Sequence, residues 1–176
     1  VTGCPFTVRD FVLLSRYPHL SPFSRIGKED VEAVEKALDA TGTTELSDRS
    51  FDTLSGGEKQ MVSIASVLAQ GAGILLLDEP AAYLDPNHSR RINDLIESLR
   101  VGMGITVVSV THDLNDALLG VGTLLLLGSG RVIYTGDAGA ALAEGMLEKL
   151  YGRDFEYSVH PSTGSMFVLP DAGRRP

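Results

Sequence analysis

The sequence of 176 residues has no tryptophan, a single cysteine and no long apolar segment. A disulfide needs two cysteines, so the lone Cys4 excludes an internal one, as expected for a protein of a reducing compartment. The longest aliphatic runs, Ile74–Leu77 and Leu124–Leu127, fall far short of the roughly 20 residues of a membrane-spanning helix. No signal peptide is visible. We therefore expect no direct membrane insertion.

Basic residues are also few. The 15 Lys and Arg residues are outnumbered by 23 Asp and Glu residues, which gives a net charge of −8. The basic residues are scattered, and the only adjacent pairs are Arg90-Arg91 and Arg174-Arg175. Nucleic-acid backbones and anionic membrane surfaces are bound by clustered Lys and Arg. We therefore predict no nucleic-acid partner, and we expect any membrane association to run through a protein partner.

The segment 54–58, Leu-Ser-Gly-Gly-Glu, has the pattern of a helix start. Ser55 is a good N-cap, and Glu58 three residues later completes a capping box. Gly56 and Gly57 each weaken a first helical turn by roughly 1 kcal/mol relative to Ala. They leave bare backbone N–H groups at the positive end of the helix, where a phosphate can bind closely. An apolar stripe follows at helical spacing: Met61, Ile64, Ala65 and Leu68.

A strand, a helix and a second strand come next. The aliphatic run Ile74–Leu77 predicts a buried strand, which ends in two carboxylates, Asp78 and Glu79. Asp85 followed by Pro86 predicts an N-cap with proline at the first helical position. The second strand is expected over 105–110. This order is typical of a βαβ unit with parallel strands.

The carboxyl end of the second strand carries a histidine, His112, followed by Asp113. Parallel strands end at the same edge of a sheet, so we expect His112 and Glu79 to emerge together. The other predicted elements are a Thr7-capped helix ending by Arg16, helices over 28–40 and 114–119, hairpins over 123–135 and 155–169, and an Asp137-capped helix ending near Leu150.

In the order LSGGE, LLLDEP, LD and THD, these motifs resemble the ATP-binding subunit of ABC transporters. The segment 16–20, Arg-Tyr-Pro-His-Leu, is similar to one found in importer ATPases for iron–siderophore, haem and cobalamin, near their contact with the membrane-spanning subunits. A second interpretation of this stretch is a surface loop whose Tyr17 and Phe23 cover a neighbouring core. The resemblance implies an α/β fold of the P-loop NTPase (ABC ATPase) type, with parallel core strands, flanking helices, an N-terminal helical subdomain and C-terminal β-hairpins.

The resemblance also implies roles for individual residues. Asp78 matches the Walker B aspartate, which holds Mg²⁺ directly or through water, and Glu79 matches the catalytic glutamate. His112 matches the switch histidine, and Asp85 the D-loop aspartate. The signature that touches ATP bound to the opposite subunit corresponds to Ser55, Gly56, Gly57 and Glu58. ATP and Mg²⁺ are thus the implied cofactors. The implied partners are a second ATP-binding subunit and the permease, which would hold the protein at the cytoplasmic face of the membrane.

Two family features do not occur in these 176 residues. A P-loop needs Gly-x-x-x-x-Gly-Lys-Ser/Thr, and Gly27-Lys28 fails because Pro22 and Glu29 occupy two of the required positions. The glutamine of the Q-loop does not precede the Thr-Val-Arg-Asp segment either. Since the sequence also begins at Val1, we expect a portion of a longer domain that does not hydrolyse ATP alone. Three departures from the family pattern indicate a divergent copy: Met61, Ser66 and Ala81-Ala82.

We expect three segments within this one domain. Residues 1–70 would form the helical subdomain ending in the signature helix, 71–136 the α/β core, and 137–176 a C-terminal helix and hairpin. Two alternatives of other classes are a non-catalytic remnant acting as an interaction module and a soluble ABC ATPase associated with nucleic acid. The acidic composition and the lack of a long coiled coil between the motifs weigh against the last.

Overall fold

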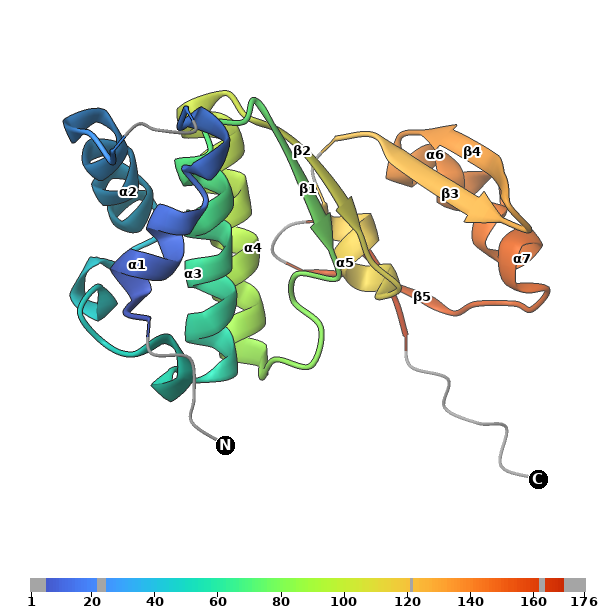
Figure 1. Ribbon diagram of the computed structural model, residues 1–176. Helices are drawn as coiled ribbons and strands as arrows, with labels where there is room; N and C mark the ends of the chain where they lie inside the picture. The colour runs from blue at the N-terminus through green and yellow to red at the C-terminus, as the bar shows by residue number, and fades with distance from the viewer. Residues whose placement is uncertain (1–5, 22–24, 121, 162–163, 170–176) are drawn as a thin grey trace. The chain divides into compact units, whose positions relative to one another are not determined.

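The structure, a computed structural model, describes residues 6–21, 25–120, 122–161 and 164–169 (Figure 1). The chain divides into two compact units, Val1–Val110 and Thr111–Pro176, and each is described by itself. This division differs from the three segments expected from the sequence, which stay a prediction. Cys4, Pro22 and Phe23 lie outside the described residues.

Unit 1 begins with three helices that pack together. Thr7 caps α1 (Val8–Leu14), as predicted, through a capping box with Asp10, and α2 (Lys28–Ala40) has the predicted bounds. Helices α1 and α2 both pack against α3 (Figure 1). The helices are α1 (Val8–Leu14), α2 (Lys28–Ala40) and α3 (Gly56–Ala69), with 3₁₀ turns at Tyr17–His19, Thr44–Leu46 and Phe51–Thr53. Their shared core is formed by Val8, Val12, Val34, Ala37, Leu38, Leu54, Val62, Ala65 and Ala69.

The segment after α1 is tied to the end of α3. The Arg16 guanidinium donates to the Ala69 carbonyl oxygen at 2.7 Å and to the Asp30 carboxylate at 3.0 Å. The backbone N–H of Gly27 first of all, and then Arg16, hold the pKa of Asp30 below its usual range. Tyr17 is 75% exposed, so the interpretation that it covers a core is wrong. The 3₁₀ turn is thus anchored by its flanks and leaves the tyrosine ring in solvent.

The second half of unit 1 is the predicted βαβ unit. Strands β1 (Ile74–Asp78) and β2 (Thr106–Val110) are parallel, with Ile74 opposite Thr106 and Asp78 opposite Val110. Helix α4 (Pro86–Met103) connects them and ends at Gly104, whose φ of +64° suits a glycine. A second core joins these elements to α3: Ile64, Leu75, Leu77, Ile92, Leu95, Leu99 and Ile105.

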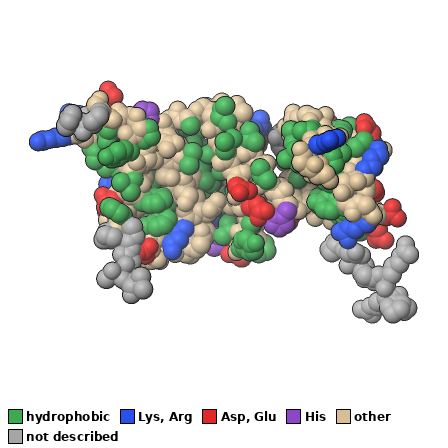
Figure 2. All heavy atoms as spheres, turned by 45° about the vertical axis from the view of Figure 1, so that its right-hand side comes forward, with side chains coloured by type: hydrophobic (Ala, Val, Ile, Leu, Met, Phe, Trp, Pro, Cys, Tyr) green, Lys and Arg blue, Asp and Glu red, His purple; other side chains and the backbone are tan. Residues whose placement is uncertain are grey.

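The predicted buried strand over Ile74–Leu77 is buried on one face only. Leu75 and Leu77 are buried, whereas Ile74 and Leu76 are 58% and 72% exposed. Side chains of a strand alternate between the two faces, and in the described part of unit 1 the second core covers one face only. Apolar side chains accordingly reach the surface, and green hydrophobic side chains are visible on the face of the molecule that Figure 2 shows.

Unit 2 is built from short helices and two hairpins. Asn115 joins α5 to β6, because its side chain donates to the Val168 carbonyl oxygen at 3.1 Å and accepts from the Val168 N–H at 2.7 Å. The elements are α5 (Leu114–Leu119), β3 (Leu124–Gly128), β4 (Arg131–Gly136), α6 (Ala138–Ala143), α7 (Met146–Tyr151), β5 (Tyr157–Val159) and β6 (Met166–Val168). Both hairpins, β3–β4 and β5–β6, are antiparallel as predicted. The core is formed by Leu118, Leu126, Leu142, Leu147 and Val168.

The expected single helix from Asp137 to Leu150 is wrong. Asp137 does cap a helix, but α6 ends at Ala143, and α7 starts after Gly145. Gly145 has a φ of +64°, a left-handed conformation that interrupts the helical hydrogen-bond ladder and that glycine adopts without steric cost. The Ala-rich composition therefore predicted the helical state and missed the break.

Candidate functional site

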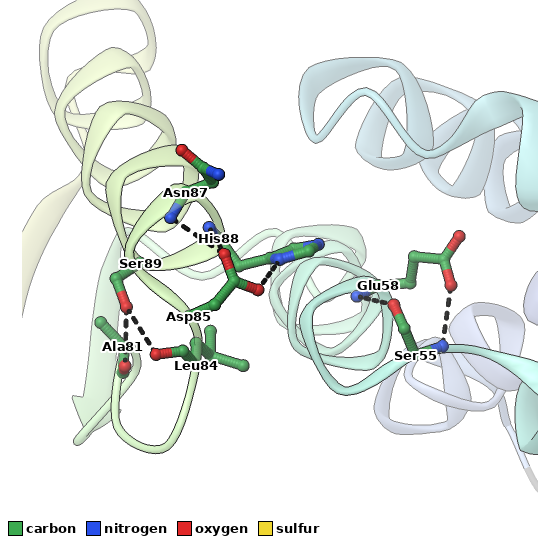
Figure 3. A network of polar contacts seen from close by, with 8 residues as sticks. All are labelled: Ser55, Glu58, Ala81, Leu84, Asp85, Asn87, His88 and Ser89. Atoms are coloured by element: carbon green, nitrogen blue, oxygen red, sulfur yellow. Dashed lines mark hydrogen bonds and ion pairs between the residues drawn. The ribbon is translucent and has the colours of Figure 1, made fainter.

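The first turn of α3 is closed by the predicted capping box (Figure 3). The Ser55 N–H donates to Glu58 Oε2 at 2.8 Å, and the Glu58 N–H donates to Ser55 Oγ at 3.3 Å. These contacts, with the Ser55 backbone N–H first, hold the pKa of the Glu58 carboxyl below its usual range. Arg49 adds an ion pair to Glu58 at 3.4 Å. The signature is thus a rigid helix start with a negative charge at its positive end.

The two signature glycines have different surroundings. Gly57 is buried, and a Cβ built on it would lie 2.8 Å from His88 Cγ and 3.0 Å from His88 Nε2, with Cδ2 closer still. Gly56 is exposed, and its Cβ would meet Leu84 Cδ2 at an ordinary 3.8 Å. Packing therefore requires glycine at 57, where the imidazole occupies the space of a side chain. It does not require glycine at 56.

Asp85 forms the start of α4, as predicted (Figure 3). Its Oδ1 accepts the N–H groups of Asn87 at 3.0 Å and His88 at 3.2 Å. Its Oδ2 is hydrogen-bonded to Nδ1 of His88, so one carboxylate both caps the helix and orients the ring. The bond to the His88 side chain is the main reason why the pKa of Asp85 lies below its ordinary value.

The loop between β1 and α4 is held by Ser89 on the first turns of α4. The Ser89 hydroxyl donates to the Ala81 carbonyl oxygen at 3.2 Å and lies 3.5 Å from that of Leu84. Tyr83 has a φ of +60° and a fully exposed side chain. A non-glycine residue with such a φ is strained by about 1 kcal/mol or more, and strain of this kind gathers at functional loops.

Two carboxylates, Asp78 and Glu79, stand at the carboxyl edge of the sheet. Asp78 pairs with Val110, and the Glu79 N–H extends the pairing by donating to the Val110 carbonyl oxygen at 2.8 Å. Glu79 then turns sharply with a φ of +47°, and its carbonyl oxygen accepts the Ala82 N–H at 3.1 Å. The left-handed conformation of Glu79 changes the direction of the chain after β1. Glu79 is thus a second strained position, which the sequence did not predict.

His112 follows β2 and is exposed. The Asp113 N–H donates to Thr111 Oγ1 at 3.0 Å, and Asp113 caps α5 by accepting the N–H groups of residues 115 and 116. The histidine therefore sits on a structured turn. His112 belongs to unit 2 and Glu79 to unit 1, so their expected proximity stays a prediction.

A cleft of about 150 Å³ lies between the starts of α3 and α4 within unit 1. Its walls include Gly57, Glu58, Met61, His88 and Arg91. Met61, one of the departures from the family pattern, also packs against the second core. The sequence did not predict a role for His88. The available signal was its position three residues after Asp85, which allows its ring to contact the capping carboxylate.

Magnesium fits this chain only as an ion shared with a phosphate. Among the residues that the structure describes, no group of three or more His, Cys, Asp or Glu side chains could hold a metal ion. Asp78 is one exposed, hard carboxylate at the strand end. Magnesium is commonly bound by one or two carboxylates together with phosphate oxygens and water, which suits this arrangement.

Comparison with known proteins supports the family that the motifs indicate. A family model described as ABC transporter matches residues 5–82, and a ferric enterobactin transport ATP-binding protein, FepC of Escherichia coli K12, is 41% identical over 164 residues. The chain belongs to the ABC transporter ATPase family. The match to FepC covers 93% of this ABC ATPase chain and 60% of FepC.

Two further relatives are named as import ATP-binding proteins. The iron(3+)-hydroxamate import ATP-binding protein FhuC of Bacillus subtilis is 39% identical, over 93% of this chain and 61% of FhuC. The hemin import ATP-binding protein HmuV of Rhodococcus jostii is 37% identical, over 98% of this chain and 58% of HmuV. The ABC ATPase chain thus spans about 60% of the length of these curated relatives.

Solved structures agree with the fold. A metal-chelate type ABC transporter in an inward-facing conformation has a TM-score of 0.84 at 29% identity, covering 96% of this chain and 67% of that one. The dimeric ABC transporter cassette MJ0796 has a TM-score of 0.62 at 29% identity, covering 76% and 57%. The predicted family and the P-loop NTPase fold class are confirmed. Nucleotide binding is a property of this family.

The capping box makes the stability of α3 dependent on pH. The folded-state pKa of Glu58 is depressed, so its contribution is fully present above the unfolded value near 4.3 and is lost as the pH falls through the lower folded value. We expect Glu58→Gln to lower the free energy of unfolding by about 0.5 kcal/mol at pH 7, the low end for caps, and by less near pH 3. Urea titrations at both pH values measure this.

Glu32→Gln on the exposed face of α2 is the matched control, and we expect no change from it at either pH. An equal loss from Glu58→Gln at pH 7 and pH 3 would show that the carboxylate charge does not stabilise the cap.

The two signature glycines should respond oppositely to alanine. Gly57→Ala forces a methyl group into His88 and is expected to destabilise unit 1 by about 1–3 kcal/mol, the usual cost of overpacking. Gly56→Ala meets only an ordinary contact, so the gain in helix propensity should stabilise the chain by up to about 1 kcal/mol. Thermal unfolding of both variants measures the difference, and shifts of the same sign would contradict it.

Proposed function

We propose that this chain forms part of an ATP-binding, ATP-hydrolysing subunit that energises an ABC importer for an iron–siderophore, haem or cobalamin. The observation that carries the proposal is the capped signature turn beside Asp85, in a chain whose relatives are named as transport or import ATP-binding proteins. A cobalamin import ATP-binding protein of Halobacterium salinarum, 34% identical, adds the third class of substrate. The proposed substrate range rests on the names of these relatives.

The signature would bind ATP held by the P-loop of another subunit. Gly56 and Gly57 lie in the first turn of α3, where backbone N–H groups have no acceptor within the helix and point outward at its positive end. The Ser55 hydroxyl oxygen accepts the Glu58 N–H, which leaves its own hydrogen able to donate to a phosphate. These donors supply the anion-binding half of a composite site.

The acidic strand end would carry the hydrolytic chemistry. Asp78 would hold Mg²⁺ directly or through water, and the ion, when bound, neutralises charge on the phosphate oxygens. Glu79, on its left-handed turn, would orient the attacking water and accept its proton at a carboxylate oxygen. His112 would donate a hydrogen bond to the γ-phosphate, and Asp85 would contact the opposite subunit as the D-loop aspartate.

Two kinds of partner follow from the proposal. A second ATP-binding subunit would complete the site, and permease subunits would hold the protein at the cytoplasmic face of the membrane. The dimer of the MJ0796 cassette supports the first. Among the described residues, no helix is both long and apolar enough to cross a membrane.

ATP hydrolysis is tested with a fusion protein. The part of FepC that precedes the segment matched by this chain is joined to Val1. We expect the fusion to hydrolyse ATP in the presence of Mg²⁺. Glu79→Gln should lower kcat by at least about 100-fold, because removal of a general base costs 10²–10⁴-fold.

Glu32→Gln, on the exposed face of α2, should leave kcat unchanged. Circular dichroism shows whether each protein is folded. A folded fusion without ATPase activity, or one that Glu79→Gln leaves fully active, would overturn the proposal.

A further inference from the structure

One side chain joins the starts of two helices that are far apart in sequence. His88 belongs to the first turn of α4, and its ring extends toward the first turn of α3 (Figure 3). At one end, Nδ1 is hydrogen-bonded to Asp85; at the other, the ring fills the space above Gly57. Asp85 and Gly57 therefore both lie next to the His88 side chain.

The orientation of the ring is set by Asp85. A carboxylate only accepts hydrogen bonds, so Nδ1 carries the hydrogen in its bond to Oδ2. The other oxygen of Asp85 accepts two backbone N–H groups of the same helix turn, which fixes the carboxylate itself. A movement of Asp85 must therefore turn or shift the imidazole.

On the side that faces Gly57, the ring lies close against the backbone of α3. The space where Gly57 would carry a side chain is already occupied by Cγ, Cδ2 and Nε2 of His88. Gly57 is buried, and it is the second residue of the turn whose N–H groups face a phosphate in the proposed site. A shift of the ring toward α3 would therefore press on the backbone of that turn.

We propose that His88 is a positioning residue of the signature, which couples the position of the D-loop aspartate to the first turn of α3. The coupling is a property of unit 1 alone. Its effect on ATP binding rests on the proposed function, because the binding of a phosphate by the first turn of α3 is part of that proposal. A contact of Asp85 with a second subunit would then reach Gly57 through the imidazole.

The coupling is tested by NMR on the chain of residues 1–176. Asp85→Ser keeps an N-cap acceptor but is too short to reach Nδ1, so it cuts the bond to the ring without removing the cap. We expect it to shift the Gly57 amide resonance, and to leave that resonance in place in a His88→Ala background. Asp113→Ser, the same change at the cap of α5 in unit 2, is the matched control and should not move it.

If Asp85→Ser shifts the Gly57 resonance equally with and without His88, the coupling does not run through the imidazole and the proposal is overturned. Should His88→Ala fail to fold, His88→Phe serves as the second background, because it keeps a ring over Gly57 but has no Nδ1. The expected result there is also an unresponsive Gly57.

The consequence for catalysis is measured in the FepC fusion. A positioning residue should change kcat for ATP hydrolysis about tenfold, within the range that a misplaced catalytic group costs, and leave KM for ATP nearly unchanged. His88→Asn keeps a donor near the place of Nδ1 and should retain more of kcat than His88→Ala.

The two proposals fail separately. An inactive wild-type fusion contradicts the proposed function, while the NMR result still decides the coupling. An active fusion whose kcat is unchanged by His88→Ala leaves the proposed function intact and overturns the positioning role.

Discussion

The burial of α3 on two sides determines where the signature lies. Val62, Ala65 and Ala69 face the core shared with α1 and α2, whereas Ile64 faces the core shared with β1 and α4. Full burial of a valine or isoleucine side chain stabilises a fold by roughly 2 kcal/mol. Separation of α3 from either core would therefore cost stability. With its axis held from both sides, α3 presents Ser55 and Gly56 to solvent while Gly57 meets α4.

The acidic strand end depends on the same second core. Leu75 and Leu77 hold β1 against α4, and the parallel register then places Asp78 beside Val110. Glu79 follows in a left-handed conformation that costs free energy and persists because the Val110 carbonyl oxygen and Ala82 N–H hold it. The signature and the carboxylates are therefore positioned by one body of packed side chains, unit 1.

Local features were predictable from the sequence, and features set by packing were not. The caps at Thr7, Ser55 and Asp85 depend on residues three positions apart or fewer, so their pattern is visible in the chain. The contact of His88 with Gly57 depends on how α3 and α4 meet, which no spacing rule describes. The exposure of Leu76 likewise depends on which elements cover the sheet.

The central claim is that this chain offers its signature to ATP held by another subunit. The most direct measurement follows the Gly56 and Gly57 amide resonances of the chain while ATP·Mg²⁺ and full-length FepC, as a P-loop-bearing partner, are added singly and together. Hydrogen bonding to a phosphate moves an amide proton downfield, so the account predicts a downfield shift only when both are present. A shift with ATP·Mg²⁺ alone, or none with both, would contradict it.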